Sequence, residues 1–251
     1  MSIALEVKDL TVRFAGLTAV SGVTLDVDTA TVCSMIGPNG AGKTTLFNAI
    51  TGFVTPASGS VRFNGVELAG LKTHAIAKAG IRRTFQGGGL FADMTVLENV
   101  LCGVQGRLET RFIDTLLGLP GARRAERAAV DEAMRLLEEL DLTAHADRLA
   151  SELPFGLQRQ VDITLALAAK AELIMLDEPA VGLSVADCER LAAVLRQVTA
   201  RGVTVMMIEH NMNLVMSASD KVTVLNYGQM LACGTPDEIR SDESVLEAYL
   251  G

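Results

Sequence analysis

The stretch from residue 37 to residue 45, GPNGAGKTT, constrains this chain more than any other, because it fits the pattern G-x-x-x-x-G-K-[ST]. A short apolar run, residues 31–36, precedes it, and a run with helical apolar spacing follows it and stops at Gly52. Glycines let the backbone turn its N–H groups toward phosphate oxygens, and the new helix adds its positive end. A glycine-rich turn without a ligand is the alternative, but the bare pattern arises by chance in roughly one chain of this length in a hundred. The loop therefore predicts a phosphate site between a strand and a helix.

Each residue of this loop has an expected contact. Lys43 is expected to reach the β and γ phosphates of a nucleotide, and the Thr44 hydroxyl is expected to bind Mg²⁺. The residues predicted to contact the nucleotide are Gly37, Pro38, Asn39, Gly40, Ala41, Gly42, Lys43, Thr44 and Thr45.

Polar side chains also end two apolar runs further along the chain. Asp177 and Glu178 follow residues 173–176, and His210 follows the run 203–208 closely. If both runs are parallel strands, these residues line the same nucleotide cleft. Asp177 is then expected to hold Mg²⁺ through water, Glu178 to activate the water that attacks the γ phosphate, and His210 to bind that phosphate. The alternative is a pair of polar strand ends without a ligand. His74 and His145 lack such a position and are interpreted as ordinary residues.

The composition limits the class of protein. With 49% hydrophobic and 21% charged residues, the chain is globular. Its net charge, 22 − 30 = −8, argues against binding to DNA, RNA or anionic lipid. No apolar run reaches the roughly eighteen residues of a membrane span, and the N-terminus lacks a signal-peptide pattern. We therefore expect a cytoplasmic chain, soluble when isolated, that contacts a membrane only through a protein partner. The four widely spaced cysteines are interpreted as packing residues: Cys33, Cys102, Cys188 and Cys233.

The order of predicted elements indicates an α/β fold in three parts. Short strands over residues 3–36, and a hairpin over 60–68 that turns at Asn64-Gly65, predict an antiparallel β layer. From Gly87 the pattern becomes helical, with helices over 96–101, capped by Thr95, and over 123–140. From residue 173 strands and helices alternate, which predicts a mostly parallel sheet. Residues 104–125 are either surface or a docking element.

Together these stretches resemble, along the whole chain, the nucleotide-binding subunit of ATP-binding-cassette (ABC) transporters. Within that family the chain is most similar to the longer of the two ATPases of branched-chain (hydrophobic) amino-acid importers. The resemblance implies a P-loop ATPase core over residues 1–86 and 160–251 and an inserted helical subdomain over 87–159. The stretches that carry it are residues 37–47, RTFQ at 83–86, 94–100, 173–179, 208–212 and the tail from 234 to 251.

The resemblance also implies roles that spacing alone does not give. Phe14 matches the aromatic residue that stacks on adenine, although it could instead be a core residue of the β layer. Gln86 matches the glutamine that binds Mg²⁺ and senses the γ phosphate. The segment LPFGLQ at 153–158 stands in place of the signature LSGGQ, so Pro154, Phe155 and Gly156 are expected to contact ATP bound to another subunit. Val181 to Ser184 match the loop that links the two active sites.

Several positions depart from the family pattern. Pro154 replaces the signature serine and removes a hydroxyl, while Leu157 replaces the signature glutamine. Backbone donors at the start of the following helix remain. Three further departures are Ala30 in place of glycine, Thr164 in place of alanine and Leu165 in place of arginine. These changes bear on the strength of ATP-driven dimerisation and leave the chemistry of Lys43, Asp177 and Glu178 untouched.

The function that the resemblance implies is ATP hydrolysis coupled to transport, with ATP and Mg²⁺ as the ligands. The chain is expected to form a head-to-tail dimer with itself or a paralogue, to move an integral membrane permease, and to serve an extracytoplasmic solute-binding protein, without nucleic acid. Uptake of branched-chain or other hydrophobic amino acids is the main expectation. The alternatives are urea or amide uptake, lipopolysaccharide or lipid export, a soluble ABC ATPase outside transport, and a P-loop kinase. The chain does not touch the solute, so its sequence leaves the solute open.

Overall fold

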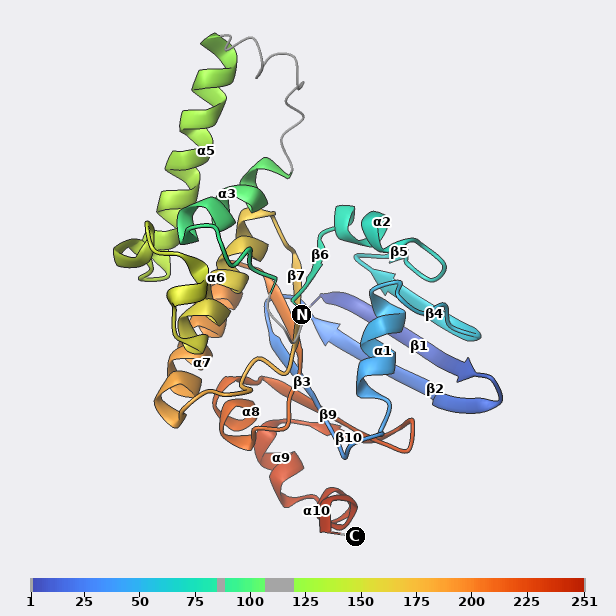
Figure 1. Cartoon of the computed structure of the whole chain (residues 1–251). Helices are drawn as coiled ribbons and strands as arrows, with labels where there is room; N and C mark the ends of the chain where they lie inside the picture. The colour runs from blue at the N-terminus through green and yellow to red at the C-terminus, as the bar shows by residue number, and fades with distance from the viewer. Residues whose placement is uncertain (1, 85–88, 107–119, 251) are drawn as a thin grey trace. The chain divides into compact units, whose positions relative to one another are not determined.

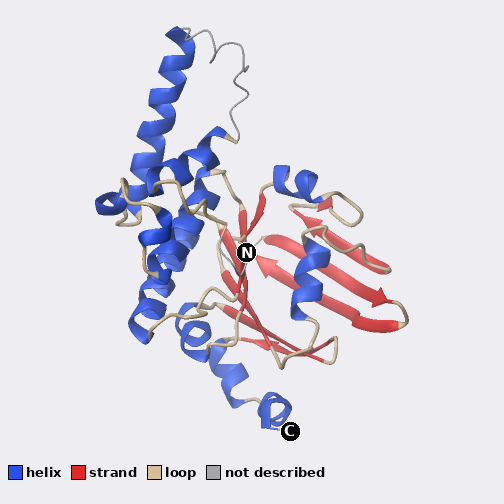
Figure 2. Ribbon diagram, viewed as in Figure 1, coloured by secondary structure: helices blue, strands red, loops and turns tan. Residues whose placement is uncertain are grey.

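The computed structural model describes residues 2–84, 89–106 and 120–250. The chain divides into two compact units, one formed by residues 1–86 and 172–251 and the other by residues 87–171 (Figure 1). The first unit contains both β-sheets, and the second is helical (Figure 2). The predicted helical insertion between two parts of an α/β core is thus present.

The first sheet of unit one is antiparallel, in the order β2-β1-β4-β5. Its strands are β1 (Ile3–Phe14), β2 (Leu17–Asp28), β4 (Ser58–Phe63) and β5 (Val66–Glu67). The predicted hairpin turn is confirmed, because Asn64 and Gly65 join β4 to β5 with φ angles of 47° and 78°. Both residues tolerate this left-handed conformation, which a two-residue hairpin turn requires. The sequence predicted only short strands over residues 3–36, whereas β1 is one strand of 12 residues with register irregularities.

The second sheet is mostly parallel, in the order β10-β9-β3-β8-β7-β6. Its strands are β3 (Val32–Ile36), β6 (Ile81–Arg83), β7 (Leu173–Asp177), β8 (Thr204–Ile208), β9 (Lys221–Asn226) and β10 (Gln229–Gly234). Among the strands that the structure describes in this sheet, β10 alone pairs antiparallel, with β9. All residues of β3 and β8 are buried, as expected for parallel strands covered on both faces. The predicted α/β fold with a mostly parallel core and an antiparallel N-terminal layer is confirmed.

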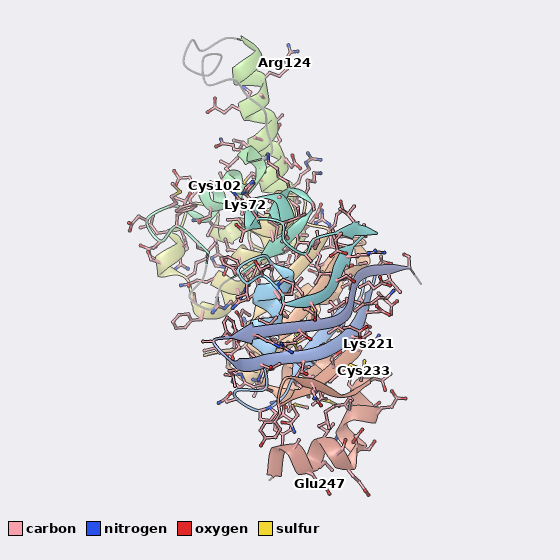
Figure 3. All side chains as sticks on the ribbon, turned by 90° about the vertical axis from the view of Figure 1, so that its right-hand side faces the viewer. Lys72, Cys102, Arg124, Lys221, Cys233 and Glu247 are labelled. Atoms are coloured by element: carbon pink, nitrogen blue, oxygen red, sulfur yellow. The ribbon has the colours of Figure 1, made fainter. Side chains whose placement is uncertain are left out.

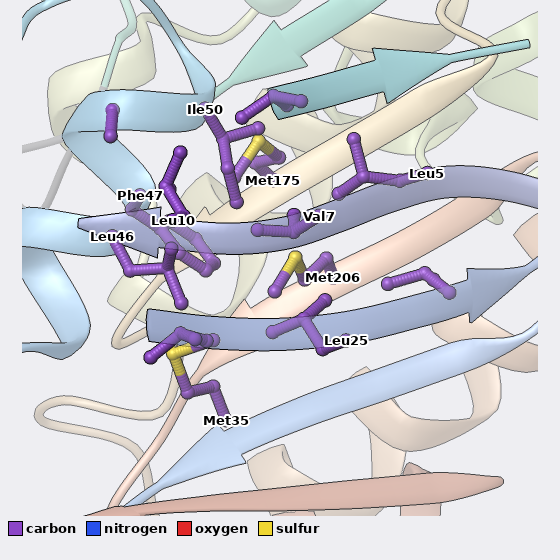
Figure 4. Close-up of a cluster of buried hydrophobic side chains, with 14 of the residues drawn as sticks. Leu5, Val7, Leu10, Leu25, Met35, Leu46, Phe47, Ile50, Met175 and Met206 are labelled. Atoms are coloured by element: carbon purple, nitrogen blue, oxygen red, sulfur yellow. The ribbon is translucent and has the colours of Figure 1, made fainter. Parts of the chain in front are cut away.

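The larger buried cluster of unit one includes helix α1 (Lys43–Ile50) and residues of both sheets. Leu46, Phe47 and Ile50 of α1 belong to one buried cluster with residues of β1, β7 and β8 (Figure 4). Each such fully buried side chain contributes about 1.5–3 kcal/mol. This packing fixes the helix that begins at the phosphate loop. The other helices of this unit are α2 (Thr73–Lys78), α7 (Val185–Ala200), α8 (Met212–Ala218), α9 (Pro236–Ser241) and α10 (Glu243–Leu250).

The α-helices described in the second unit are α3 (Val96–Gln105), α5 (Pro120–Glu139) and α6 (Phe155–Ala168). Thr95 and Glu98 form a capping box at the start of α3, as the predicted cap requires. The expected domain boundary at residue 160 falls inside α6, which is one continuous helix that packs against α3 and α5. The return to the first unit therefore comes at residue 172. Of the segment 104–125, residues 107–119 lie outside the described part of the chain.

Two expectations from composition can be compared with the structure. All four cysteines are free, and Cys33 and Cys188 are buried as expected, but Cys233 is exposed on the edge strand β10. Its interpretation as a packing residue was therefore wrong, because one face of an edge strand meets solvent. Within residues 2–84, 89–106 and 120–250, no helix combines the length and apolar character needed to cross a membrane.

Candidate active site

The phosphate loop follows β3 and leads directly into α1, and its conformation depends on glycine. Gly37, Gly40 and Gly42 have φ angles of 145°, 80° and 99°. A Cβ on Gly42 would lie 2.6 Å from the carbonyl oxygen of Ala19, and one on Gly37 would collide with the carbonyl oxygen of Leu225. The loop is thus held between β2 and the end of β9, and only glycine fits at these two points.

The Lys43 side chain folds back against the start of the phosphate loop. Its Nζ donates to the carbonyl oxygens of Gly37 at 2.7 Å and Pro38 at 2.9 Å. Burial lowers the pKa of Lys43, while the negative charge of Glu178 opposes that shift. The ammonium group is therefore placed to exchange two carbonyl acceptors for phosphate oxygens, which form stronger charge-assisted hydrogen bonds.

A hollow of about 200 Å³ lies over the loop and contains the predicted base. It is lined by Ala19, residues 39–45 and Glu178. Thr44, the second residue of α1, is exposed in this hollow. The structure thus brings the phosphate loop and the Glu178 carboxylate, far apart in sequence, to one concave site.

The strand ends meet as the parallel sheet predicts. Asp177 is the last residue of β7, and Glu178 follows it with a left-handed φ of 49°. The backbone N–H of Glu178 donates to Ile208 O at 3.0 Å, which ties it to the end of β8. His210 Nδ1 lies 4.0 Å from Glu178 Oε1, so these two predicted site residues are neighbours. A non-glycine residue in this conformation is uncommon and is often found at functional sites.

Glu209 is a residue of this site that the sequence analysis missed. Its side chain is fully buried, and Oε1 accepts from the Ala180 amide at 2.7 Å. Oε2 accepts from the amides of His210 and Asn211, both at 2.8 Å. Hydrogen bonds to a charged acceptor are the strong ones, so Glu209 fixes the segment after Glu178 to the segment that carries His210. A carboxylate at the end of an otherwise apolar run was the available signal.

Arg83 is a second residue whose role the sequence did not reveal. Its guanidinium forms a 2.7 Å ion pair with Asp177, the predicted metal carboxylate. The sequence included Arg83 only as part of the RTFQ stretch.

The residues of this site fit a magnesium ion that is held largely by its substrate. Thr44 and Asp177 carry hard oxygen atoms of the kind that Mg²⁺ prefers as ligands. Across the described parts of the chain, no group of three or more His, Cys, Asp or Glu side chains could hold a metal alone. A divalent ion here would take most of its ligands from phosphate and water, which is typical of Mg²⁺ in nucleotide sites. Gln86, the third predicted ligand, lies outside the described residues.

The residues assigned by resemblance have varied surroundings. Phe14 ends β1 with 44% of its surface exposed, so it is not a core residue and its ring is accessible for stacking. Ala30, where the family has glycine, has a left-handed φ of 57°, which explains the glycine preference. Ser184 caps α7 through Asp187, which ends the loop that begins at Val181.

The signature segment, residues 153–158, belongs to the second unit. Pro154 is the N-cap of α6, and Phe155 in its first turn is 64% exposed. Gln158 donates to Leu153 O at 2.8 Å and so closes the segment on itself. Gly156 follows in the same first turn, where backbone N–H groups lack partners within the helix.

Comparison with known families agrees with this fold and site. The family model described as ABC transporter matches residues 20–181, so the chain belongs to the ABC transporter family and is one of its ATP-binding cassettes. Residues 229–251 match a second model, described as branched-chain amino acid ATP-binding cassette transporter. Within the ABC family the chain therefore groups with the ATP-binding subunits of branched-chain amino acid transporters, as the resemblance implied.

Individual relatives give the same classification. The chain is 47% identical to the high-affinity branched-chain amino acid transport ATP-binding protein BraF of Pseudomonas aeruginosa, over 98% of this chain and 97% of BraF. It is 43% identical to LivG of Escherichia coli strain K12, a protein of the same description, with the same coverage. Among solved structures, the ADP conformation of MJ1267, an ATP-binding cassette of an ABC transporter, superposes with a TM-score of 0.87. That match has 31% identity and covers all of both chains.

Proposed function

We propose that this chain is the ATP-hydrolysing subunit of an ABC importer that energises uptake of branched-chain or other hydrophobic amino acids through a membrane permease. The observation that carries the hydrolytic part is the hollow shared by the phosphate loop and Glu178. Support for the cargo comes from the relatives named above and from the C-terminal segment 229–251.

Hydrolysis depends on positioning and on charge stabilisation. The loop amides and Lys43 hold the β and γ phosphates, and Phe14 stacks on the adenine. Thr44, Gln86 and Asp177 are the proposed magnesium ligands, and Mg²⁺ when bound neutralises charge on the phosphates. Glu178 accepts the proton of the attacking water, while His210 donates a hydrogen bond to the γ phosphate. The Glu209 carboxylate keeps the segments of Glu178 and His210 in register.

The proposed partners follow from family membership. Two cassettes, identical or paralogous, pair head to tail, and Pro154, Phe155 and Gly156 of each contact the nucleotide of the other. The helical unit drives a permease at the cytoplasmic face of the membrane, and an extracytoplasmic binding protein delivers the solute.

The decisive variant is Glu178→Gln, which keeps the shape of the side chain and removes the base. We expect it to bind ATP and to lose turnover by about 10²–10⁴-fold, the usual contribution of a positioned base. Steady-state phosphate release by the purified chain, assembled with its permease where that is required, measures this loss. Glu189→Gln, an exposed carboxylate on α7, is the matched control and should hydrolyse ATP at the wild-type rate. A Glu178→Gln rate above about a tenth of wild type would contradict the assignment of the base.

Uptake assays in cells test the cargo. The Glu178→Gln gene replaces the native one, and uptake of labelled leucine, urea and short-chain amides is measured in parallel. Loss of leucine uptake is the expected result. Loss of urea or amide uptake alone would support an importer ATPase with a different solute. Unchanged uptake of all three solutes would favour export or a role outside transport.

A further inference from the structure

Arg83, the last residue of β6, makes a set of contacts that the hydrolytic mechanism does not use. Its Nη2 donates to Asp177 Oδ2 at 2.7 Å, and its Nη1 donates to Asn48 Oδ1 at 2.6 Å and lies 3.3 Å from Thr51 Oγ1. Both charged partners are largely buried, with 8% of the Arg83 side chain and 12% of the Asp177 side chain exposed. An ion pair this shielded is screened little by salt.

Two aromatic rings hold the guanidinium plane in addition. The Arg83 Cζ lies 5.8 Å from the ring centre of Phe47 and 5.7 Å from that of Phe53. Cation–π contacts at such distances are favourable. Only arginine combines a planar fork with stacking, so lysine could not reproduce these contacts.

The contacts connect two elements that the nucleotide site depends on. Asn48 lies in α1, the helix that begins at the phosphate loop, and Thr51 is its C-cap. Asp177 ends β7, and β6 pairs with β7 so that Arg83 lies opposite Met175. Arg83 thus joins the helix that positions the phosphates to the strand that positions the metal carboxylate.

A carboxylate needs such support to serve a hydrated metal. Asp177 offers two oxygens, each able to accept two hydrogen bonds. The bond from Arg83 engages Oδ2 and fixes the rotation of the group, so Oδ1 is left to receive metal-bound water. Hydrogen-bonded partners of metal-binding carboxylates typically contribute about 10–100-fold to metal affinity or activity.

We propose that Arg83 is a positioning residue of the metal site, which holds Asp177 in the orientation that receives the Mg²⁺ of MgATP and couples it to α1. This inference rests on the proposed function, because it takes MgATP as the ligand. It assigns to Arg83 an effect on metal-dependent nucleotide affinity in addition to any effect on stability.

The test compares ATP affinity with and without magnesium. Calorimetric titration of the full chain with ATP is done in excess Mg²⁺ and in EDTA. The quantity compared is the dissociation constant in EDTA divided by that in Mg²⁺. For Arg83→Met we expect this ratio to fall about tenfold, while the affinity for metal-free ATP stays at the wild-type value. In an Asp177→Asn background, where the ratio is already lost, Arg83→Met should change it no further.

Arg82→Met is the matched control on the same strand. The neighbouring Arg82 is half-buried, but it donates to the backbone carbonyls of Ala77 and Ile81. Its loss should lower the melting temperature and leave the magnesium ratio unchanged. If Arg83→Met is too unstable to titrate, Arg83→Lys keeps the charge and should still show a reduced ratio, because lysine lacks the fork.

The outcomes separate this inference from the proposed function. Equal weakening of both affinities in Arg83→Met, or an unchanged ratio, would show that Arg83 is only a structural support. A wild-type chain that binds ATP equally well with and without Mg²⁺ would overturn the proposed metal site, and the role of Arg83 with it.

Discussion

One residue of the proposed catalytic site, Glu178, has a strained left-handed backbone. Glu178 has a φ of 49°, in a region that costs a non-glycine residue roughly 1–2 kcal/mol. Such a conformation persists only where surrounding bonds determine it. Here two hydrogen bonds do so. The Glu178 N–H donates to the Ile208 carbonyl oxygen, and the Ala180 N–H donates to the buried Glu209 carboxylate. The proposed base is therefore held by the strand beside it rather than by local preference.

Exposure and thiol pKa distinguish Cys233 from the two buried cysteines, Cys33 and Cys188. Burial raises the pKa of the Cys33 thiol to about 12 and also raises that of Cys188. Because the thiolate is the reactive form, a buried thiol far below its pKa is inert. At pH 8 we expect a thiol reagent such as DTNB to modify Cys233, exposed on β10 and marked in Figure 3, well before Cys33 or Cys188.

Counting reacted thiols in native and denatured protein, with peptide mass spectrometry, checks this order. Cys233→Ser should remove the fast-reacting thiol and leave the total after denaturation lower by that one group. Labelling of Cys33 before Cys233 would show that the central strand β3 opens readily.

Close packing between two helices explains why glycine stands at position 103. Helices α3 and α6 approach closely at Gly103, where a Cβ would lie 2.6 Å from the Leu165 carbonyl oxygen and 2.9 Å from Ala168 Cβ. Leu165 and Thr164, which depart from the family pattern, lie in this part of α6. The Thr164 hydroxyl is fully buried and donates to Gln160 O at 2.7 Å, so it is satisfied within its own helix. These departures are accommodated by packing within the helical unit.

Gly103→Val tests that contact. We expect it to lower the free energy of unfolding by about 1–3 kcal/mol, because an added side chain must push two backbones apart. Urea unfolding followed by circular dichroism measures the change, and Gly103→Ala should give a smaller loss. Ala128→Val, on the exposed face of α5, is the control and should cost no more than about 0.7 kcal/mol from helix propensity. Equal losses at both positions would mean that α3 and α6 are not tightly packed in solution.

The whole molecule is proposed to act as a pair of cassettes, and the signature segment decides how firmly they close. Pro154 offers no hydroxyl, but the first turn of α6 still presents backbone donors near Phe155 and Gly156. Helix N-termini bind phosphate through such donors and through the helix dipole. Bound nucleotide is therefore expected to be sufficient to close the dimer of two cassettes.

Light scattering of Glu178→Gln with MgATP tests closure. The mass should rise from 26.6 kDa to twice that value, because the nucleotide that bridges two cassettes is not consumed. Lys43→Ala under the same conditions is the control and should remain monomeric. Persistent monomers of Glu178→Gln at saturating MgATP would mean that this signature segment cannot close a dimer unaided.

The sequence alone determined the elements whose signals are local. The phosphate loop, the hairpin at Asn64-Gly65, the cap at Thr95 and the apolar strands that end at Asp177 and near His210 all follow from spacing and residue type. Family resemblance then gave the class of protein. The sequence did not reveal the partnerships between distant residues. Arg83 and Asp177 are 94 positions apart, and Glu209, which follows β8, accepts a hydrogen bond from Ala180, which lies just after β7. These pairs form only because the sheet places β6, β7 and β8 side by side. Strand order is set by packing of the whole core, so the tertiary structure alone decided which charged groups support the proposed catalytic residues.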